Sequence, residues 1–327
     1  MAEMTLAEAF AGYLADIGLA RSPNTARTYR NALQAFSACL QDLGVDPAET
    51  PVGGAQVEWI VDFIRHLKDY APASERLYLS AVSGWFDNLA AQRLAEVNLP
   101  QLRLLIRRRG RRPGIRLPQF PRQDIESILE SAQPSPAEGK ETARLRALRD
   151  RALLFTLADT GLRVHEACNL RRGDLDWNEG RAVLIGKGDR QAVVRFSERS
   201  LRCLRQYLAA RAQLDGATGR PLSALPLFAR HDRAAGARVL PISTTTARAI
   251  VRQRVGQTLG ETQRGSITPH SFRHYFVTTV LRGSGGNLKL AQELARHRSI
   301  AVTQRYAHLS DDELDRGYYE IFDSGEE

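Results

Sequence analysis

Charged residues at close spacing are the feature of this sequence that could do chemistry. Arg163 and Glu166 stand three residues apart just after a glycine, and His270 and Arg273 have the same spacing. On a helix this spacing brings two side chains onto one face. Lys187 is one of only four lysines in a chain with 42 arginines. Because lysine can lose its proton in a protein whereas arginine cannot, Lys187 is a candidate proton donor, the alternative being a solvated lysine in a turn.

Two further polar residues lie near the C-terminus. His297 ends an expected helix, and Tyr306 follows nine residues later. Taken singly, a histidine is most often structural or on the surface. A single tyrosine, such as Tyr275, Tyr318 or Tyr319, is most often part of the core or its rim. The significance of these residues therefore depends on their order along the chain.

The elements that must position these residues are mainly helical. The pattern predicts helices at residues 123–131, 142–157, 163–170, 197–214, 243–259, 269–282, 288–296 and 301–308, and a last helix that begins after Ser310. Ser197 and Ser243 are candidate N-caps. Residues 181–185 and 191–196 are rich in Val and Ile and flank Gly186-Lys-Gly-Asp. This pattern predicts a β-hairpin with Lys187 in its turn.

Residues 1–105 predict a small bundle of four helices without strands. Thr5 and Glu8 have the spacing of a capping box, and Ser22 and Ser74 are candidate N-caps. The third helix is expected near residues 57–67 and the fourth near 74–89. The expected fold class is therefore mainly α with a small β-hairpin or sheet (α+β).

An arginine-rich stretch separates the two halves. Residues 97–123 hold eight arginines and no Asp, Glu or Lys, which leaves 38 basic and 37 acidic residues elsewhere. Concentrated positive charge is typical of a protein that binds nucleic acid or an anionic membrane, the alternative being a solvated basic linker or a localisation signal. Glycines and prolines in the same stretch interrupt regular structure. We expect a helical domain at 1–105, a linker at 106–121 and a second domain at 122–327.

Four motifs occur in order along the second half. They are Thr160-Gly-Leu-Arg-Val-His-Glu-Ala-Cys-Asn-Leu, Gly186-Lys-Gly-Asp-Arg, Thr268-Pro-His-Ser-Phe-Arg-His, and Ala295-Arg-His-Arg-Ser-Ile followed by Tyr306. Together they resemble the signature motifs of the tyrosine recombinases, the phage integrase and Xer-type family, over about residues 115–320. The resemblance implies a core-binding (SAM-like) DNA-binding domain, a linker and a catalytic domain. It also implies site-specific DNA recombination, in which DNA strands are cleaved and rejoined through a covalent 3′-phosphotyrosyl intermediate and exchanged through a Holliday junction in a tetramer.

The resemblance implies a role for each matching residue. Arg163 and Arg273 correspond to the two arginines that clamp the non-bridging oxygens of a phosphodiester. Tyr306 corresponds to the nucleophile, which forms a covalent 3′-phosphotyrosyl bond and releases a 5′-hydroxyl. His270 corresponds to the proton acceptor and Lys187 to the general acid.

Supporting positions follow from the same resemblance. His297 corresponds to a residue that hydrogen-bonds the scissile phosphate, Glu166 to one that orients the arginine and histidine side chains, and His274 is expected to support the same helix. We expect no metal, because clustered carboxylates do not accompany these cations. No other cofactor is expected, since the covalent intermediate conserves the bond energy without ATP. The sequence departs from the family pattern at Arg296, where glycine is usual, at Arg190 and at Phe272.

The expected partner is double-stranded DNA carrying a specific target site. Phosphate contacts are predicted from the arginine-rich stretch, namely Arg107, Arg108, Arg109, Arg111 and Arg112. The segment after Tyr306 carries Tyr318, Tyr319, Ile321 and Phe322. It is expected to dock on a neighbouring protomer, giving a dimer on one site and a tetramer in the synapse, the alternative being packing onto its own domain. Accessory proteins are further candidate partners.

Composition excludes several classes of protein. With 43% hydrophobic and 25% charged residues, the chain is typical of a folded domain rather than a disordered one. It has no apolar run of about 18–20 residues that could span a membrane, and its first residues do not resemble a signal peptide. Cys39, Cys168 and Cys203 show no zinc-site or disulfide spacing. The expected location is the cytoplasm, in association with the nucleoid.

Two other functions remain open at this stage. One is a type IB topoisomerase-like enzyme, which relaxes supercoils by similar chemistry. The other is a non-catalytic DNA-binding regulator on the same fold. The complete set of catalytic residue types favours a recombinase over the regulator, because a protein that only binds DNA has no need of Lys187 or Tyr306.

Overall fold

The computed structural model describes residues 3–111, 122–132, 141–185, 191–236, 238–297 and 299–304. The chain divides into two compact units, Met1–Arg116 and Leu117–Glu327. Several predicted features lie outside the described residues: Arg112, the hairpin turn with Lys187 and Arg190, and everything from residue 305 onward, including Tyr306 and the helix expected after Ser310.

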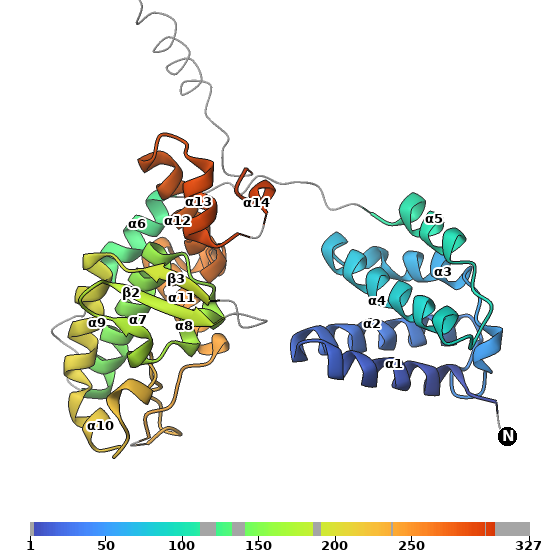
Figure 1. Ribbon diagram of the computed structural model, residues 1–327, viewed down its shortest axis with the longest axis horizontal. Coiled ribbons are helices and arrows are strands. Elements are labelled where there is room, and N and C mark those ends of the chain that lie inside the picture. The colour runs from blue at the N-terminus through green and yellow to red at the C-terminus, as the bar shows by residue number, and fades with distance from the viewer. Residues whose placement is uncertain are drawn as a thin grey trace, which may run out of the picture. The chain divides into compact units, whose positions relative to one another are not determined.

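The first unit is a helical bundle (Figure 1). Its helices are α1 (Leu6–Ala20), α2 (Pro23–Asp42), α3 (Trp59–His66), α4 (Pro72–Ala91) and α5 (Leu99–Arg109). Helix α2 packs against α1, α3 and α4, and α5 packs against α3 and α4. Buried aromatic rings fill the centre: the Trp85 ring centroid lies 4.6 Å from that of Phe10 and 4.8 Å from that of Phe86, and Phe36 lies 5.0 Å from Phe63.

Local capping signals set the starts of these helices. Thr5 and Glu8 form the predicted capping box at α1, and the Ser22 side chain caps α2. The prediction that Ser74 caps the fourth helix was wrong, because α4 begins earlier, at Pro72. Proline suits the first turn of a helix, since its fixed φ is helical and its missing N–H has no partner to lose there.

Helix α5 was not predicted. The predicted helical region ended at residue 105 and the predicted linker began at 106, but the helix continues to Arg109, so residues 106–109 are helical. Leu102 is buried, and Asn98 caps the first turn. Three exposed arginines fill the last turn, where positive charge interacts favourably with the helix dipole. Three arginines of the arginine-rich stretch therefore belong to the end of a helix.

The second unit is mainly helical. Its helices are α6 (Arg122–Ser131), α7 (Glu141–Thr160), α8 (Val164–Asn169), α9 (Glu198–Ala210), α10 (Ala212–Gly216), α11 (Thr244–Leu259), α12 (Pro269–Gly283), α13 (Leu288–Ala295) and α14 (Ile300–Gln304). Helix α7 is the central element, buried along most of its length and packed against α9 and α12. Ser197 and Ser243 cap α9 and α11, as predicted.

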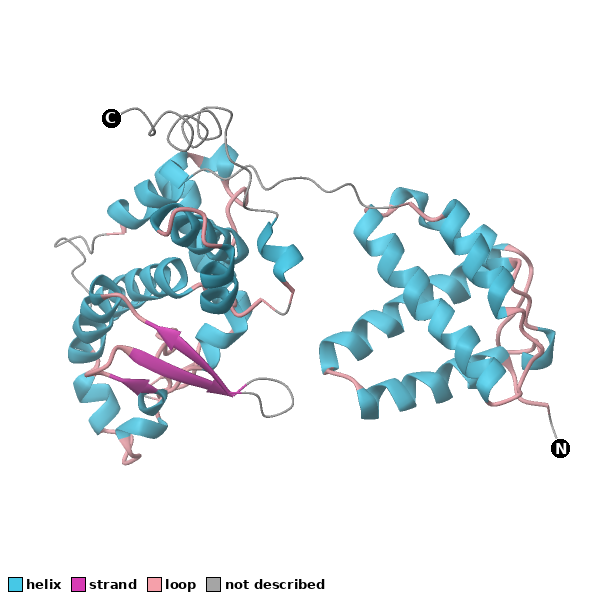
Figure 2. Cartoon of the chain, turned by 45° about the horizontal axis from the view of Figure 1, so that its top comes forward, coloured by secondary structure: helices cyan, strands magenta, loops and turns pink. Residues whose placement is uncertain are grey.

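A small antiparallel sheet lies within the second unit (Figure 2). Strands β1 (Leu175–Asp176), β2 (Arg181–Ile185) and β3 (Gln191–Arg195) are arranged in that order. The β2–β3 hairpin was predicted, whereas the two-residue β1 is too short to give a pattern. Ala182 and Val194 are a cross-strand pair whose side chains join the core, and the next pair, Val183 and Val193, is exposed. The α+β fold class is confirmed.

None of the helices in the described ranges is both long and apolar enough to cross a membrane.

Candidate active site

A glycine turn places the first catalytic candidate. Helix α7 ends at Thr160, and Gly161 follows with a φ of +59°. A Cβ at this position would clash with the ring of Phe276 on α12. Glycine is therefore required both for the positive φ and for the close packing. The turn brings Arg163 to the start of α8.

Glu166 holds Arg163 through two contacts. The backbone N–H of Arg163 donates to Glu166 Oε2 at 2.8 Å, and Arg163 Nη1 donates to Oε1 at 2.9 Å. Burial by itself raises the pKa of the Glu166 carboxyl, but the Arg163 backbone hydrogen bond and the charges of Arg296 and Arg163 outweigh burial and hold the pKa below its usual value. Glu166 is therefore ionised at neutral pH and orients the guanidinium of Arg163.

Backbone carbonyls fix the second arginine. Arg273 on α12 is only 3% exposed. Its Nη1 donates to the carbonyl of Gly161 and its Nη2 to the carbonyl of Ala295. The first carbonyl belongs to the turn before α8 and the second to the last residue of α13. Arg273 thus ties together three segments that are far apart in the sequence.

Three histidines lie close to these arginines. The ring centroids of His270 and His274 are 4.2 Å apart in an edge-to-face arrangement, and His297 Nδ1 lies 2.9 Å from Thr303 Oγ1. Burial, and then the charge of Arg273 and its neighbours, lowers the pKa of His270 and lowers that of His297 to about 4. Burial and the neighbouring His270 lower the pKa of His274 to about 4. The three imidazoles are therefore neutral at pH 7, and a neutral imidazole is able to accept a proton.

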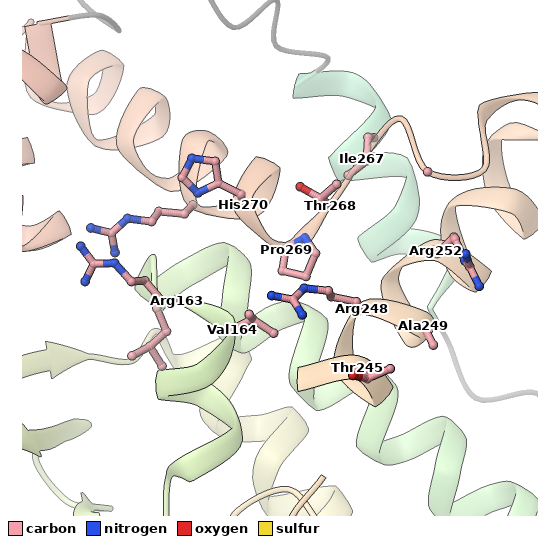
Figure 3. A pocket seen from close by; sticks show the side chains of 13 residues that line it. Arg163, Val164, Thr245, Arg248, Ala249, Arg252, Ile267, Thr268, Pro269 and His270 are labelled. Carbon is pink, nitrogen blue, oxygen red and sulfur yellow. The ribbon is translucent and has the colours of Figure 1, made fainter. Parts of the chain in front are cut away.

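A cavity of about 710 Å³ lies beside some of these side chains. Arg163, His270 and Arg273 line it, together with Arg248 and Arg252 of α11. In Figure 3, Arg248 lies between Val164 and Pro269. Sequence reasoning missed both α11 arginines. Their four-residue spacing on a predicted helix, which places them on one face, is the signal that could have found them.

The structure brings together four of the candidate residues, Arg163, Glu166, His270 and Arg273, with His274 against His270. Electrostatic coupling to Arg273 and Arg163 also connects His297 to this group. Lys187 and Tyr306 lie outside the described residues. Within the described ranges, no group of three or more His, Cys, Asp or Glu side chains is placed to hold a metal ion.

Tyr275 is buried in the hydrophobic core of the second unit. It is 5% exposed, and its hydroxyl donates to Glu126 Oε1 at 3.4 Å. This tyrosine shares α12 with His270 and Arg273 but belongs to the hydrophobic core cluster of the unit. Its position does not favour it as an alternative nucleophile.

The arginines predicted to contact phosphates differ in their surroundings. Arg107, Arg108 and Arg109 are exposed in the last turn of α5. Arg111 instead forms an ion pair with the fully buried Glu75 and donates to the carbonyl of Tyr70 at 2.7 Å. The structure thus gives Arg111 an internal role that differs from the predicted phosphate contact, because its guanidinium is occupied within the bundle.

Comparison with known proteins identifies the family. Residues 120–313, more than half of the chain, match the model of the phage integrase family. The chain belongs to the phage integrase family. The tyrosine recombinase XerD of Mycobacterium tuberculosis (strain ATCC 25618 / H37Rv) is 31% identical over 310 residues, which cover 92% of this chain and 93% of the relative. The tyrosine recombinase XerC of Myxococcus xanthus is 30% identical over 251 residues, 76% of each chain.

A solved structure shows the same fold. The Tn1549 transposon integrase, in complex with transposon right end DNA, matches with a TM-score of 0.66 and 17% identity over 98% of this chain and all of that one. The predicted family is confirmed, and the protein is an enzyme, a tyrosine recombinase. The relatives do not favour the topoisomerase or the non-catalytic regulator.

Proposed function

We propose that this tyrosine recombinase cleaves and rejoins double-stranded DNA at a specific target site, with Tyr306 as its nucleophile. The observation that carries the proposal is the cavity in which Arg163, His270 and Arg273 meet. In the absence of substrate, Glu166 already holds the guanidinium of Arg163, and two backbone carbonyls hold that of Arg273. A fixed pair of cations suits a phosphodiester, whose negative charge increases in the transition state.

The proposed cleavage step assigns each group one task. The Tyr306 oxygen attacks phosphorus while its proton passes to the neutral imidazole of His270. The bond from phosphorus to the 5′ oxygen breaks, and Lys187 supplies the proton that the leaving oxygen needs. The products are a 3′-phosphotyrosyl bond and a 5′-hydroxyl. Rejoining is the reverse step with the 5′-hydroxyl of another strand, and it needs no ATP because the covalent bond conserves the energy.

Arg163 and Arg273 stabilise the phosphate in this scheme. Each guanidinium presents several N–H donors in a plane, which matches the non-bridging oxygens of a phosphate. His297 is the proposed further donor to the scissile phosphate. Its coupling to Arg273 and Arg163 supports this assignment.

DNA binding beyond the scissile phosphate is proposed to involve two cationic surfaces. One is the end of α5, with exposed Arg107, Arg108 and Arg109; Arg112 is assigned to the same role from its place in the sequence. The other is the α11 face that carries Arg248 and Arg252. Such contacts position the protein on the phosphate backbone, whereas base contacts specify the sequence.

The assembly and domain roles belong to the same proposal. Residues 1–111 form the core-binding domain and residues from 122 the catalytic domain, joined by a linker. Two copies bind one target site and four meet in the synapse, where strands exchange through a Holliday junction. The segment after Tyr306 docks on a neighbouring protomer. The enzyme acts in the cytoplasm, on DNA of the nucleoid.

The decisive experiment captures the covalent intermediate. Purified protein is mixed with fragments of the source genome, denatured, and the protein-linked fragments are recovered and sequenced. We expect wild type to give an adduct at one class of site. Tyr306→Phe is expected to bind the same fragments in a filter assay without forming an adduct, while Tyr275→Phe, the matched control, still forms one. An adduct that survives Tyr306→Phe contradicts the assignment and directs the test to Tyr319.

A further inference from the structure

Arg296 has a backbone conformation that costs energy for any residue except glycine. It ends α13 with φ 56° and ψ 45°, in the left-handed region. Among the described residues, the other non-glycine residue with positive φ is Arg93. A side chain at Cβ crowds the backbone in this region, so such positions persist only where surrounding interactions compensate.

The Arg296 side chain points into the active site. It is only 12% exposed, and its Nη2 donates to Glu166 Oε2 at 3.2 Å. The same nitrogen lies 3.4 Å from the carbonyl of Gly161. A guanidinium keeps its charge in a protein, and a buried charge is tolerated only when it is paired. Glu166 therefore provides the compensation for both the burial and the backbone conformation.

Arg296 shares an acceptor with each catalytic arginine. Glu166 Oε2, which Arg296 contacts, also accepts the backbone N–H of Arg163. The Gly161 carbonyl, which Arg296 also contacts, accepts a hydrogen bond from Arg273. The two anchors of the phosphate clamp are thus bridged by one side chain that comes from a third element, the end of α13.

We infer that Arg296 is a positioning residue for DNA cleavage, which holds Glu166 and the Gly161 carbonyl and so fixes the two arginines that these groups orient. The inference rests on the proposed role of Arg163 and Arg273 as the phosphate clamp. Without Arg296, Glu166 keeps both of its Arg163 contacts but loses the contact that ties it to α13. The arginines then retain their charge but lose a fixed geometry, on which rate depends steeply.

Three variants separate this role from a structural one. Arg296→Gly removes the side chain and relieves the backbone, Arg296→Lys keeps the charge without the planar guanidinium, and Arg93→Gly relieves the same backbone conformation at an exposed position in the first unit. We expect both glycine variants to be at least as resistant to thermal unfolding as wild type. We expect cleavage to slow about 10- to 100-fold in Arg296→Gly, less in Arg296→Lys, and not in Arg93→Gly.

The measurement is single-turnover cleavage of the DNA fragments captured above, at saturating protein, beside the DNA dissociation constant. A slower rate at unchanged affinity supports positioning. A loss of affinity that accounts for the slower rate overturns the inference, because Arg296 would then contact DNA directly. A rate for Arg296→Gly equal to that of Arg93→Gly also overturns it.

A double-mutant cycle tests the route through Glu166. If Arg296 acts through this carboxylate, Arg296→Gly has a smaller effect on the rate in a Glu166→Gln background than in wild type. Equal effects in both backgrounds overturn that route. Failure of the proposed function gives a different result, namely no Tyr306-dependent adduct from the wild-type protein.

Discussion

The buried carboxylate of Glu75 on α4 binds both the backbone N–H and the side chain of Arg111. Arg111 N–H donates to Glu75 Oε1 at 2.8 Å, and the guanidinium pairs with Oε2 and donates to the carbonyl of Leu67 at 3.1 Å. Burial raises the pKa of the Glu75 carboxyl, but the hydrogen bonds and charge of Arg111 outweigh it and lower the pKa overall. Arg111, which lies two residues beyond the end of α5, is therefore still anchored to the helical bundle of the first unit.

Arg111→Ala is expected to destabilise the first unit by about 3 kcal/mol, because it leaves the Glu75 carboxylate buried without its partner. Urea unfolding of the full chain, followed by tryptophan fluorescence, measures this change, since Trp59 and Trp85 lie in the core of this unit. Arg108→Ala removes an exposed arginine of α5 and is expected to leave stability unchanged. Equal stability of the two variants would show that the ion pair contributes little.

The exposed arginines of α5 are expected to govern the salt dependence of DNA binding. Each phosphate contact contributes about one unit to the slope of log affinity against log salt concentration. Replacing Arg107, Arg108 and Arg109 by glutamine is expected to flatten the slope by up to about three units and to weaken binding to all DNA sequences. Fluorescence anisotropy at several salt concentrations gives the slope. An unchanged slope would remove these residues from the DNA interface.

Cleavage is expected to persist below the usual pKa of histidine and to be lost at lower pH. Burial, and then the charges of Arg273 and Arg163, lower the pKa of His270, so the imidazole remains able to accept a proton as the pH falls through 6.5. The rate constant at limiting DNA concentration reports the free enzyme and is the quantity to follow against pH. His270→Gln should abolish the acid limb along with most activity. An acid limb centred above pH 6.5 would contradict this prediction.

A buried polar network in the second unit surrounds His231. The Tyr207 hydroxyl accepts hydrogen bonds from Ala229 N–H at 3.1 Å and Arg211 Nη1 at 3.0 Å. Its own hydrogen is therefore directed to His231 Nε2, at 2.8 Å, and this nitrogen must be unprotonated to accept it. Burial, and then the charges of Arg149 and Arg211, lower the pKa of His231 to about 4.

Acid is expected to destabilise the second unit through His231. The folded-state pKa lies below the value of 6.5 for an exposed histidine, so between pH 6.5 and 4 the unfolded chain binds more protons than the folded one. Stability is therefore full above pH 6.5 and falls toward pH 4, by an amount on the order of 3 kcal/mol. Thermal unfolding at stepped pH measures the effect. His231→Gln is expected to reduce the slope, and a slope identical to that of wild type would assign it to other groups.

The sequence by itself determined the family, the helical character and most helix starts. These features are local: Thr5, Ser22, Ser197 and Ser243 cap helices through neighbours three residues away, and the motif order requires no knowledge of folding. Chemical type also identified Arg163, His270 and Arg273 as candidates, because a phosphate requires such groups. Where a local signal was ambiguous, as at Ser74, the prediction was wrong, and helix α5 at the start of the arginine-rich stretch was not predicted.

Only the tertiary structure decided what each charged side chain binds. Arg111 and Arg108 are alike in sequence context, yet one is paired with Glu75, 36 residues away, and the other is exposed. Arg296 meets Glu166 across 130 residues. Such contacts arise from the packing of helices that are distant in the sequence. A buried charge requires a partner of opposite charge, whereas an exposed charge is solvated by water and does not. No periodicity or motif in the sequence indicates which arginine pairs with a buried carboxylate and which stays exposed to solvent.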